Sequence, residues 1–407
     1  MSPKEIRLLD HWLGVPMVFA LTFWKSCISI FKFNKNGAAE PRKIIFIKLI
    51  EQGATVLAYS AMEKAIETVG ANNVFFLVFS ENKPVLEIIG IIPNENIFEI
   101  RNNGFFAFVY DVLKCVIRIR KINIDTAIDM EFFSRFSAVL TYCSGAKNRV
   151  GNHCFLSEQP YRGNLMTHKI QYNPFVHVAT AYLLLVDSLY SDKTDIPLPK
   201  LKLEGIKILT PKYLPNAGET EEVKTLVSAE LNDKILFPVI ILNPNASDLI
   251  PIRKWELSNF IGLSQKLIDH FKSHLTIIIT GGQNEIATGK EFYNKINSQR
   301  VINLAGKTSI KQLFTLYSIS DVLVTNDSGP GHFASMTEIK DIVLFGPETP
   351  RLYGPLGENV FCIESNISCS PCVNPYNYRF SPCKNNVCMQ SISVDTVFNK
   401  IIEVLPL

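Results

Sequence analysis

Short apolar runs alternate with segments of helical period along most of the chain. Runs rich in Ile, Val, Leu and Phe recur through its first half, and segments with apolar residues three or four positions apart separate them. This alternation is typical of parallel α/β units, in which a helix follows each strand. The predicted strands of the first half are residues 43–49, 74–79, 97–100 and 126–129, and its predicted helices are residues 55–68, 106–118 and 134–142.

The same alternation returns in the second half, after a segment of different composition. Residues 192–222 are rich in Pro, Lys and Thr, which is poor material for a core, and we expect a linker there. The predicted strands beyond it are residues 238–242, 275–280, 321–325 and 341–345, and the predicted helices are residues 257–271, 284–296, 310–318 and 394–404.

The length of the chain supports two lobes, because 407 residues are too many for one ordinary core. We predict an α/β protein with two Rossmann-like lobes, the first over residues 37–200 and the second over residues 201–407. Residues 1–36 form a separate apolar or amphipathic segment.

An apolar run of about a dozen residues, 13–24, lies in that N-terminal segment and is shorter than the roughly 20 residues needed to span a bilayer. It suits a helix lying at a membrane surface, where aromatic rings sit at headgroup level and lysines meet anionic lipid. A helix packed on the protein itself fits the same pattern, and both alternatives stay open. The residues concerned are Trp12, Trp24, Lys25, Phe31, Lys32 and Lys35.

Composition narrows the classes of function. The chain is 47% hydrophobic and 19% charged, as in globular proteins, and its formal charge of +3 is too small to indicate a nucleic-acid partner. The N-terminal apolar run follows Asp10 and lacks a small-residue cleavage site, so we expect no cleaved signal. The expected location is the cytoplasm, with the inner face of the cytoplasmic membrane as the alternative.

The strongest candidate site follows the predicted strand 321–325. The loop Asn326–His332 contains Asp327, Ser328 and Gly329, and ligands in open parallel sheets bind beyond the carboxyl ends of strands. Glycines let a diphosphate approach backbone amides at a helix start. Asp327 can accept hydrogen bonds from sugar hydroxyls, and His332 can donate one to phosphate. The alternative is a helix cap followed by turn glycines.

A second polar loop follows the predicted strand 238–242 and leads to two cations. Their charges would neutralise a leaving diphosphate, which glycosyl transfer without a metal requires. A solvated basic turn is the alternative, and a glycine pair after strand 275–280 is a weaker signal. The donor-binding candidates of these loops are Asn245, Ser247, Arg253, Lys254, Gly281 and Gly282.

The sequence lacks one kind of metal-binding motif and allows another. The sequence contains no Asp-x-Asp pair of the kind that holds a divalent metal on a diphosphate, so we predict a metal-independent reaction that requires no cofactor. The spacing of four C-terminal cysteines allows a structural Zn, although it departs from typical zinc ribbons. A reduced loop, or disulfides in an exported protein, fit as well. These cysteines are Cys369, Cys372, Cys383 and Cys388.

The order and spacing of five segments resemble glycosyltransferase family 9, the heptosyltransferase-like enzymes of lipopolysaccharide assembly. The resemblance implies GT-B architecture, in which two Rossmann-like lobes face a cleft. It also implies inverting transfer from a nucleotide sugar such as ADP-heptose, bound mainly by the second lobe, to a lipid-linked saccharide met by the first. The segments are Asn243–Trp255, Gly281-Gly282, Leu304–Thr308, Val324–His332 and Leu344–Pro347.

One departure from the family affects the catalytic base. Family members often carry Asp directly after the glycine of the first loop, whereas Ala54 follows Gly53 here. Inverting transfer needs a base for the acceptor hydroxyl, and Glu51 in the same loop is the nearest replacement. If Glu51 is only a surface carboxylate, Asp129 becomes the candidate.

Glu131 and Arg135 match a family segment that faces the acceptor, as does Gly53 in the first loop. Ordinary charges at a helix start explain Glu131 and Arg135 equally well. Two other functions fit the same scaffold: a sugar-nucleotide epimerase or hydrolase, and a noncatalytic protein that binds a sugar nucleotide, which the missing loop Asp makes credible.

Overall fold

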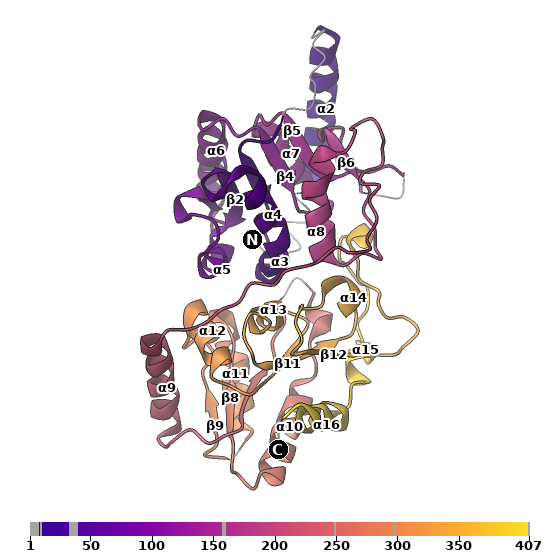
Figure 1. Cartoon of the computed structure of the whole chain (residues 1–407). Coiled ribbons are helices and arrows are strands. Elements are labelled where there is room, and N and C mark those ends of the chain that lie inside the picture. Colours follow the sequence, from indigo (N-terminus) through magenta and orange to yellow (C-terminus); the bar gives the residue numbers. More distant parts are fainter. Residues whose placement is uncertain are drawn as a thin grey trace. The chain divides into compact units, whose positions relative to one another are not determined.

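The chain divides into two compact units in its computed structural model, which describes residues 8, 10–31, 40–156, 160–247, 250–296 and 298–405 (Figure 1). The first unit is Met1–Leu209 with Pro375–Tyr378, and the second is Thr210–Asn374 with Arg379–Leu407. The units therefore divide nine residues beyond the expected boundary at residue 200, and a short C-terminal segment belongs to the first unit.

The first unit contains one parallel sheet with the strand order β3-β2-β1-β4-β5-β6. Its strands are β1 (Ile44–Ile47), β2 (Val74–Phe79), β3 (Ile97–Ile100), β4 (Thr126–Asp129), β5 (Asn148–Asn152) and β6 (His168–Ile170). Its helices are α2 (Gly14–Phe31), α3 (Gln52–Leu57), α4 (Tyr59–Val69), α5 (Lys83–Ile89), α6 (Phe105–Lys121), α7 (Arg135–Cys143) and α8 (Val178–Asp187).

Helices cover both faces of this sheet, which explains why β1 and β2 read as continuous apolar runs. Apolar side chains of α6 and Phe136 of α7 pack on the strands in one cluster. Val18 of α2 packs with Ala138 and Val139 of α7 in a smaller cluster. Helix α2 therefore packs against α7 and against the segment before β6.

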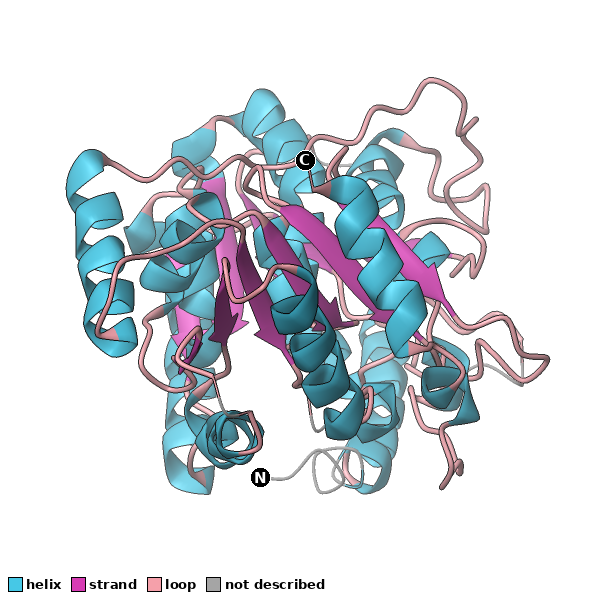
Figure 2. Ribbon diagram, turned by 90° about the horizontal axis from the view of Figure 1, so that it is seen from below, coloured by secondary structure: helices cyan, strands magenta, loops and turns pink. Residues whose placement is uncertain are grey.

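The second unit repeats the arrangement with the strand order β12-β11-β10-β7-β8-β9, and helices again flank the strands (Figure 2). Its strands are β7 (Val239–Asn243), β8 (Thr276–Ile279), β9 (Val301–Asn303), β10 (Val322–Asn326), β11 (Lys340–Phe345) and β12 (Val360–Glu364). Its helices are α9 (Ala217–Leu231), α10 (Leu257–His270), α11 (Ile286–Asn294), α12 (Ile310–Ser318), α13 (Gly329–Ala334), α14 (Pro350–Tyr353), α15 (Val387–Gln390) and α16 (Val394–Val404).

Both sheets have the topology of a doubly wound Rossmann fold, so the predicted fold class is confirmed. The connections reverse direction between β1 and β4 in the first unit and between β7 and β10 in the second. Crevices at such switch points, beyond the carboxyl ends of the strands, are the usual ligand sites of this fold. Each unit therefore has one place where a site is expected.

The N-terminal segment forms a helix that packs against the first unit along one side. Gly14 lies so close to Arg135 that a Cβ there would come within 2.8 Å of the arginine Cβ. Asn164 donates its N–H to Thr22 Oγ1 at 2.9 Å, and Lys25 Nζ donates to the Asn164 carbonyl at 2.6 Å. Lys32 and Lys35 lie outside the described residues.

Candidate functional site

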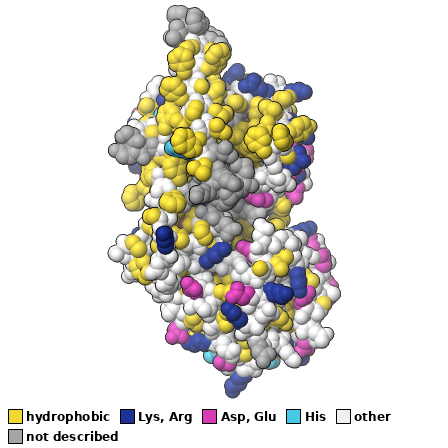
Figure 3. Space-filling model, turned by 180° about the vertical axis from the view of Figure 1, so that it is seen from behind, with side chains coloured by type: hydrophobic (Ala, Val, Ile, Leu, Met, Phe, Trp, Pro, Cys, Tyr) yellow, Lys and Arg dark blue, Asp and Glu magenta, His cyan; other side chains and the backbone are white. Residues whose placement is uncertain are grey.

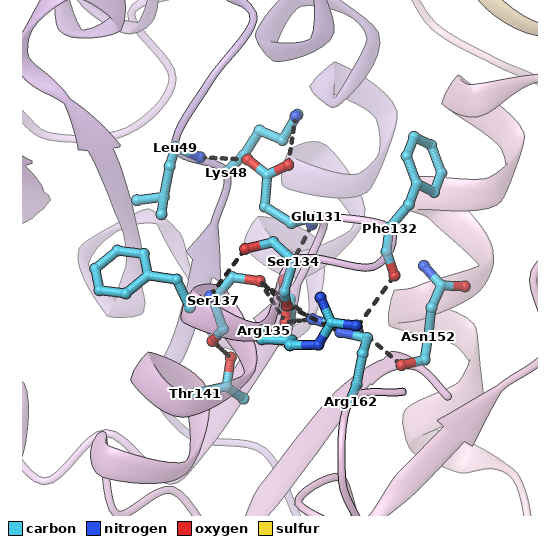
Figure 4. Close-up of polar contacts among 12 residues, drawn as sticks. Lys48, Leu49, Glu131, Phe132, Ser134, Arg135, Ser137, Thr141, Asn152 and Arg162 are labelled. Atoms are coloured by element: carbon cyan, nitrogen blue, oxygen red, sulfur yellow. Dashed lines mark hydrogen bonds and ion pairs between the residues drawn. The ribbon is translucent and has the colours of Figure 1, made fainter. Parts of the chain in front are cut away.

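The switch point of the first sheet holds a buried lysine between two carboxylates. Lys48 directly follows β1, and its Nζ lies 3.1 Å from Oε2 of both Glu51 and Glu131. The other Glu131 oxygen accepts the backbone N–H of Leu49 at 2.8 Å (Figure 4). It also accepts the N–H of Ile50 at 3.2 Å. Glu131 therefore fixes the loop that carries Glu51, a role that spacing in the sequence did not indicate.

Glu51 lies at the start of α3 with an unusual backbone. Its φ of 73° and ψ of 88° place it in the left-handed region, which costs a residue with a Cβ about 1–3 kcal/mol. Its side chain is 21% exposed. Strain of this kind persists where the surrounding structure holds it, and it is concentrated at functional sites. Gly53, which follows in α3, is buried.

Asp129 occupies a different environment at the end of β4. It is fully buried, and burial raises the pKa of its carboxyl to about 6 against the opposing charge of Arg162. Its Oδ2 accepts a hydrogen bond from Ser137 Oγ at 3.0 Å and pairs with Arg162, and its Oδ1 accepts the N–H of Glu131 at 3.0 Å. Both oxygens are therefore engaged within the protein.

Arg162 is the partner that the sequence did not reveal. Its guanidinium also donates to the carbonyls of Ser134 at 2.9 Å, Phe132 at 3.2 Å and Asn152 at 2.8 Å, so it joins the loops after β4 and β5 (Figure 4). Because Arg162 lies in a loop without periodicity, its burial had no signal in the pattern of residues.

Arg135, expected to face the acceptor, is buried at the start of α7. Its guanidinium donates to Asp10 Oδ2 at 3.1 Å, to the Tyr161 carbonyl at 2.8 Å and to the Tyr378 hydroxyl at 2.7 Å. Asp10 also accepts the N–H groups of Arg135 and Phe136 and so satisfies the first turn of the helix. Arg135 thus ties the N-terminal and C-terminal segments to the first unit.

At the switch point of the second sheet, Arg253 and Asp327 lie together. Arg253 Nη1 is 3.2 Å from Asp327 Oδ2 and 3.1 Å from Glu348 Oε2, and all three residues are buried. Arg379 Nη2 lies 3.0 Å from the other Glu348 oxygen. We call these four residues the Arg253 cluster. The sequence placed Arg253 and Asp327 near one ligand, and the structure brings them into direct contact.

Glu348 and Arg379 were missed by sequence reasoning. Glu348 lies three residues beyond the end of β11, and a carboxylate in that position was an available signal. Burial, followed by the neighbouring Asp327 charge, raises the pKa of Glu348 well above its usual value, while Arg253 opposes the shift. Glu348 is thus a buried acid held between Arg253 and Arg379.

Hydrogen bonds between loops hold this cluster in place. Asn326, at the end of β10, accepts the Trp255 N–H at 2.9 Å and donates to the carbonyls of Pro244 and Asn245. The Asn245 side chain donates to the Thr280 carbonyl at 3.3 Å. A Cβ on Gly281 would lie 2.8 Å from that amide nitrogen, so this glycine is required for close packing. Asn245 and Gly281 therefore hold the loops after β7 and β8 together.

The remaining donor candidates lie around the same strand ends. Ser328 donates to the Asn326 carbonyl at 3.0 Å, and Gly329 begins the six-residue helix α13, in which His332 is buried. Gly282 donates its N–H to Glu285 Oε2 at 2.7 Å. Lys254 is half-buried and Ser247 is exposed.

The four C-terminal cysteines differ in exposure. Cys369 and Cys383 are exposed, Cys372 is half-buried and Cys388 is buried. Cys383 Sγ lies 3.1 Å from the Asn385 carbonyl, and Cys372 Sγ lies 3.6 Å from Ser381 Oγ. Within the described residues, no three His, Cys, Asp or Glu side chains gather as a metal site. The geometry therefore supports no zinc proposal.

Two Rossmann-like units, each with polar groups at its switch point, form the fold of GT-B glycosyltransferases. Residues 112–378, more than half of the chain, match glycosyltransferase family 9 (heptosyltransferase). The chain belongs to this family, as the sequence motifs led us to expect.

A curated relative agrees with this assignment, and solved structures share the fold. Lipooligosaccharide heptosyltransferase 2 of Campylobacter jejuni is 26% identical over 265 residues, which cover 63% of this chain and 72% of that protein. The structure of E. coli ADP-heptose LPS heptosyltransferase II matches with a TM-score of 0.66 at 18% identity. The match covers 89% of this chain and 98% of the E. coli chain. The structure of the family 9 glycosyl transferase of Veillonella parvula matches with a TM-score of 0.67 at 15% identity. That match covers 90% of this chain and 98% of the V. parvula chain.

Proposed function

We propose that this protein transfers a heptose from ADP-heptose to a lipopolysaccharide or lipooligosaccharide acceptor, with inversion and without a divalent metal. Membership of family 9 supports heptosyl transfer. The name of the E. coli structure supports the donor, and the name of the C. jejuni relative supports the acceptor. The reaction would take place in the cytoplasm, where the sugar nucleotide is available.

The observation that carries the proposal is the Arg253 cluster at the switch point of the second sheet. Two guanidiniums lie there beside the glycine-containing loop after β10. Their N–H groups would donate hydrogen bonds to the diphosphate and stabilise its charge as it leaves, which is the task a metal ion performs in other transferases. Asp327 would accept hydrogen bonds from the sugar hydroxyls, with Arg253 and Glu348 holding its carboxylate in position.

We assign the role of general base to Glu51. The acceptor hydroxyl oxygen would attack the anomeric carbon from the face opposite the diphosphate, and the bond from that carbon to the diphosphate oxygen would break with its electron pair. The hydroxyl proton would pass to the Glu51 carboxylate. Partial exposure and the contact with Lys48 support this choice, whereas both oxygens of Asp129 are engaged in buried contacts.

Acceptor binding would belong to the first unit. The loop from Glu51 to Gly53 would meet the acceptor directly. Glu131 and Arg135 would act by positioning this loop and the start of α7, because their charged groups bind other parts of the first unit.

The test is a transfer assay with purified full-length protein, ADP-heptose and a heptose-free lipooligosaccharide acceptor, read by mass spectrometry. We expect one heptose to be added, equally with and without EDTA, and much less product with UDP- or GDP-sugars. Free heptose without a glycan product would indicate a hydrolase. Donor binding without consumption would indicate the noncatalytic alternative that Ala54 raises.

A further inference from the structure

Helix α6 is apolar on both of its sides. Asp111, Cys115 and Ile119 are buried on the side that faces the first sheet. The opposite side exposes six large side chains at helical spacing, and Phe106 has an exposed fraction of 87%. These residues are Phe105, Phe106, Val109, Tyr110, Leu113 and Ile117. A stripe of this size on an otherwise packed helix indicates an interaction surface.

Helix α2 and the residues just before it expose a second group of the same kind. Gly14 and Val18 face the protein, and the remaining sides present aromatic and aliphatic groups to solvent. These residues are Trp12, Leu13, Met17, Phe19, Phe23 and Trp24. The described helices contain none that is long and apolar enough to cross a membrane.

The two groups flank α7 on one side of the first sheet. The rings of Phe108 on α6 and Phe136 on α7 are 5.3 Å apart, and Arg120 Nε donates to the Cys143 carbonyl at 2.7 Å. On its other flank, α7 contacts α2 through Val18. Figure 3 shows hydrophobic side chains gathered along α2 and over a second area of the same unit. Together they form what we call the α2–α6 surface.

The two segments that carry this surface have more basic than acidic residues. Residues 10–31 and 101–121 contain two carboxylates, Asp10 and Asp111, and each forms an ion pair with an arginine. Lys114 and Lys121 are exposed on α6. Aromatic groups beside exposed lysines are typical of a helix that lies on an anionic membrane. In a two-fold dimer this face would meet itself and bring lysines against lysines.

We propose that the α2–α6 surface docks on a membrane that contains anionic lipid, with both helices lying in the plane of the interface. The aromatic and aliphatic side chains enter the headgroup region, and the lysines bind lipid phosphates. The proposal does not depend on the transfer reaction, because docking is measured in the absence of donor and acceptor.

The test is flotation of the full-length protein with vesicles of phosphatidylcholine alone or mixed with phosphatidylglycerol. Wild type should float with the mixed vesicles. The double variant Phe106→Ser/Leu113→Ser, and separately Phe19→Ser/Phe23→Ser, should bind about tenfold more weakly or worse, since each removes apolar area from the interface. Lys114→Glu/Lys121→Glu should lose the preference for phosphatidylglycerol.

Leu214→Ser provides the matched control, because Leu214 is 84% exposed in the second unit and should leave binding unchanged. Unaltered melting temperatures show that the variants are folded, as expected for exposed positions. The proposal is overturned if wild type does not bind mixed vesicles, or if the α6 variants bind as wild type does. It is also overturned if sedimentation finds a dimer that the α6 variants dissociate while vesicle binding is absent.

Discussion

Buried charges at the two switch points have different tasks. Lys48 joins Glu51 to Glu131, so its charge holds the first loop in one conformation. Arg162 compensates Asp129 deep in the first unit. Arg253 instead joins two carboxylates of the second unit at the place where a ligand is expected. Removing one partner of a buried pair typically costs about 3–5 kcal/mol, so stability and activity must be measured separately.

Replacement of Glu51 by Gln tests its role as base. The amide keeps the size of the side chain but cannot accept the proton of the acceptor hydroxyl. The single-turnover rate of transfer should fall about 100- to 10,000-fold, with donor affinity nearly unchanged. Rapid-quench kinetics and donor titration on the same preparation measure both quantities.

Asp129→Asn is the comparison for that experiment. It leaves the Arg162 charge buried without its partner, so we expect a loss of stability of about 3–5 kcal/mol. In the folded fraction, the single-turnover rate of transfer should fall less than in Glu51→Gln. If folded Asp129→Asn protein does not transfer sugar while Glu51→Gln turns over normally, the base is Asp129.

His168 makes the first unit sensitive to acid. Burial, with the charges of Lys193 and Arg149, lowers the pKa of this fully buried imidazole to about 4 from 6.5. Because the unfolded chain binds this proton at a higher pH than the folded protein does, acid favours unfolding. The stability present above pH 6.5 is therefore lost as the pH falls from 6.5 to about 4.

The variant His168→Asn should therefore show a weaker pH dependence of its free energy of unfolding. The difference between wild type and variant should change by about 3 kcal/mol across this range, as measured by urea unfolding at a series of pH values. A constant difference would show that His168 does not titrate between the two states.

At the scale of elements, the sequence predicted the fold well where strands are mostly apolar. Strands β2 and β3 and helix α12 have the bounds that periodicity indicates. Strand β5 was missed because its sequence, Asn148–Asn152, looks like a polar loop. Its side chains are satisfied only in the folded sheet, where Asn148 Nδ2 donates to Thr126 Oγ1 at 3.2 Å.

Two helices were also missed by the sequence pattern. Helix α8 is largely buried and apolar on most sides, so it has no amphipathic pattern to detect. Helix α9 begins inside the predicted linker, although the capping box of Asn216 and Glu219 was an available signal.

Within the site, sequence spacing placed Arg253 near Asp327 because both follow neighbouring strands of one sheet. It could not show that Arg162 reaches Asp129, since that contact depends on the path of a loop.

The close contact of Gly281 with Asn245 gives a prediction at this scale. Gly281→Ala should force the Asn245 amide away from the Thr280 carbonyl and so displace the loop after β7. We expect a loss of stability of about 1–3 kcal/mol in the second unit, together with weaker donor binding. Thermal unfolding and donor titration measure the two effects.

Gly104→Ala is the matched control for Gly281→Ala, because no atom lies within 4 Å of a Cβ at that position. Equal stability of the two variants would mean that the loop after β7 adjusts without cost.

At the scale of the whole molecule, the same strand order occurs twice, and each sheet brings polar side chains together at its own switch point. Under the proposed function, the repeated topology would let one chain provide both a donor site and an acceptor site. The Arg253 cluster in the second unit is the central claim, because the proposed donor, the leaving diphosphate and metal independence all depend on it.

Calorimetric titration of ADP-heptose into wild type, Asp327→Asn and Glu338→Gln tests this claim most directly. Glu338 is an exposed carboxylate of the same unit that pairs with Lys212 at the surface, so its replacement is the matched control. The loss of a charged hydrogen bond of about 1.5–3 kcal/mol predicts roughly 10- to 150-fold weaker binding by folded Asp327→Asn and unchanged binding by Glu338→Gln. Equal affinity of wild type and both variants would contradict a donor site at the Arg253 cluster.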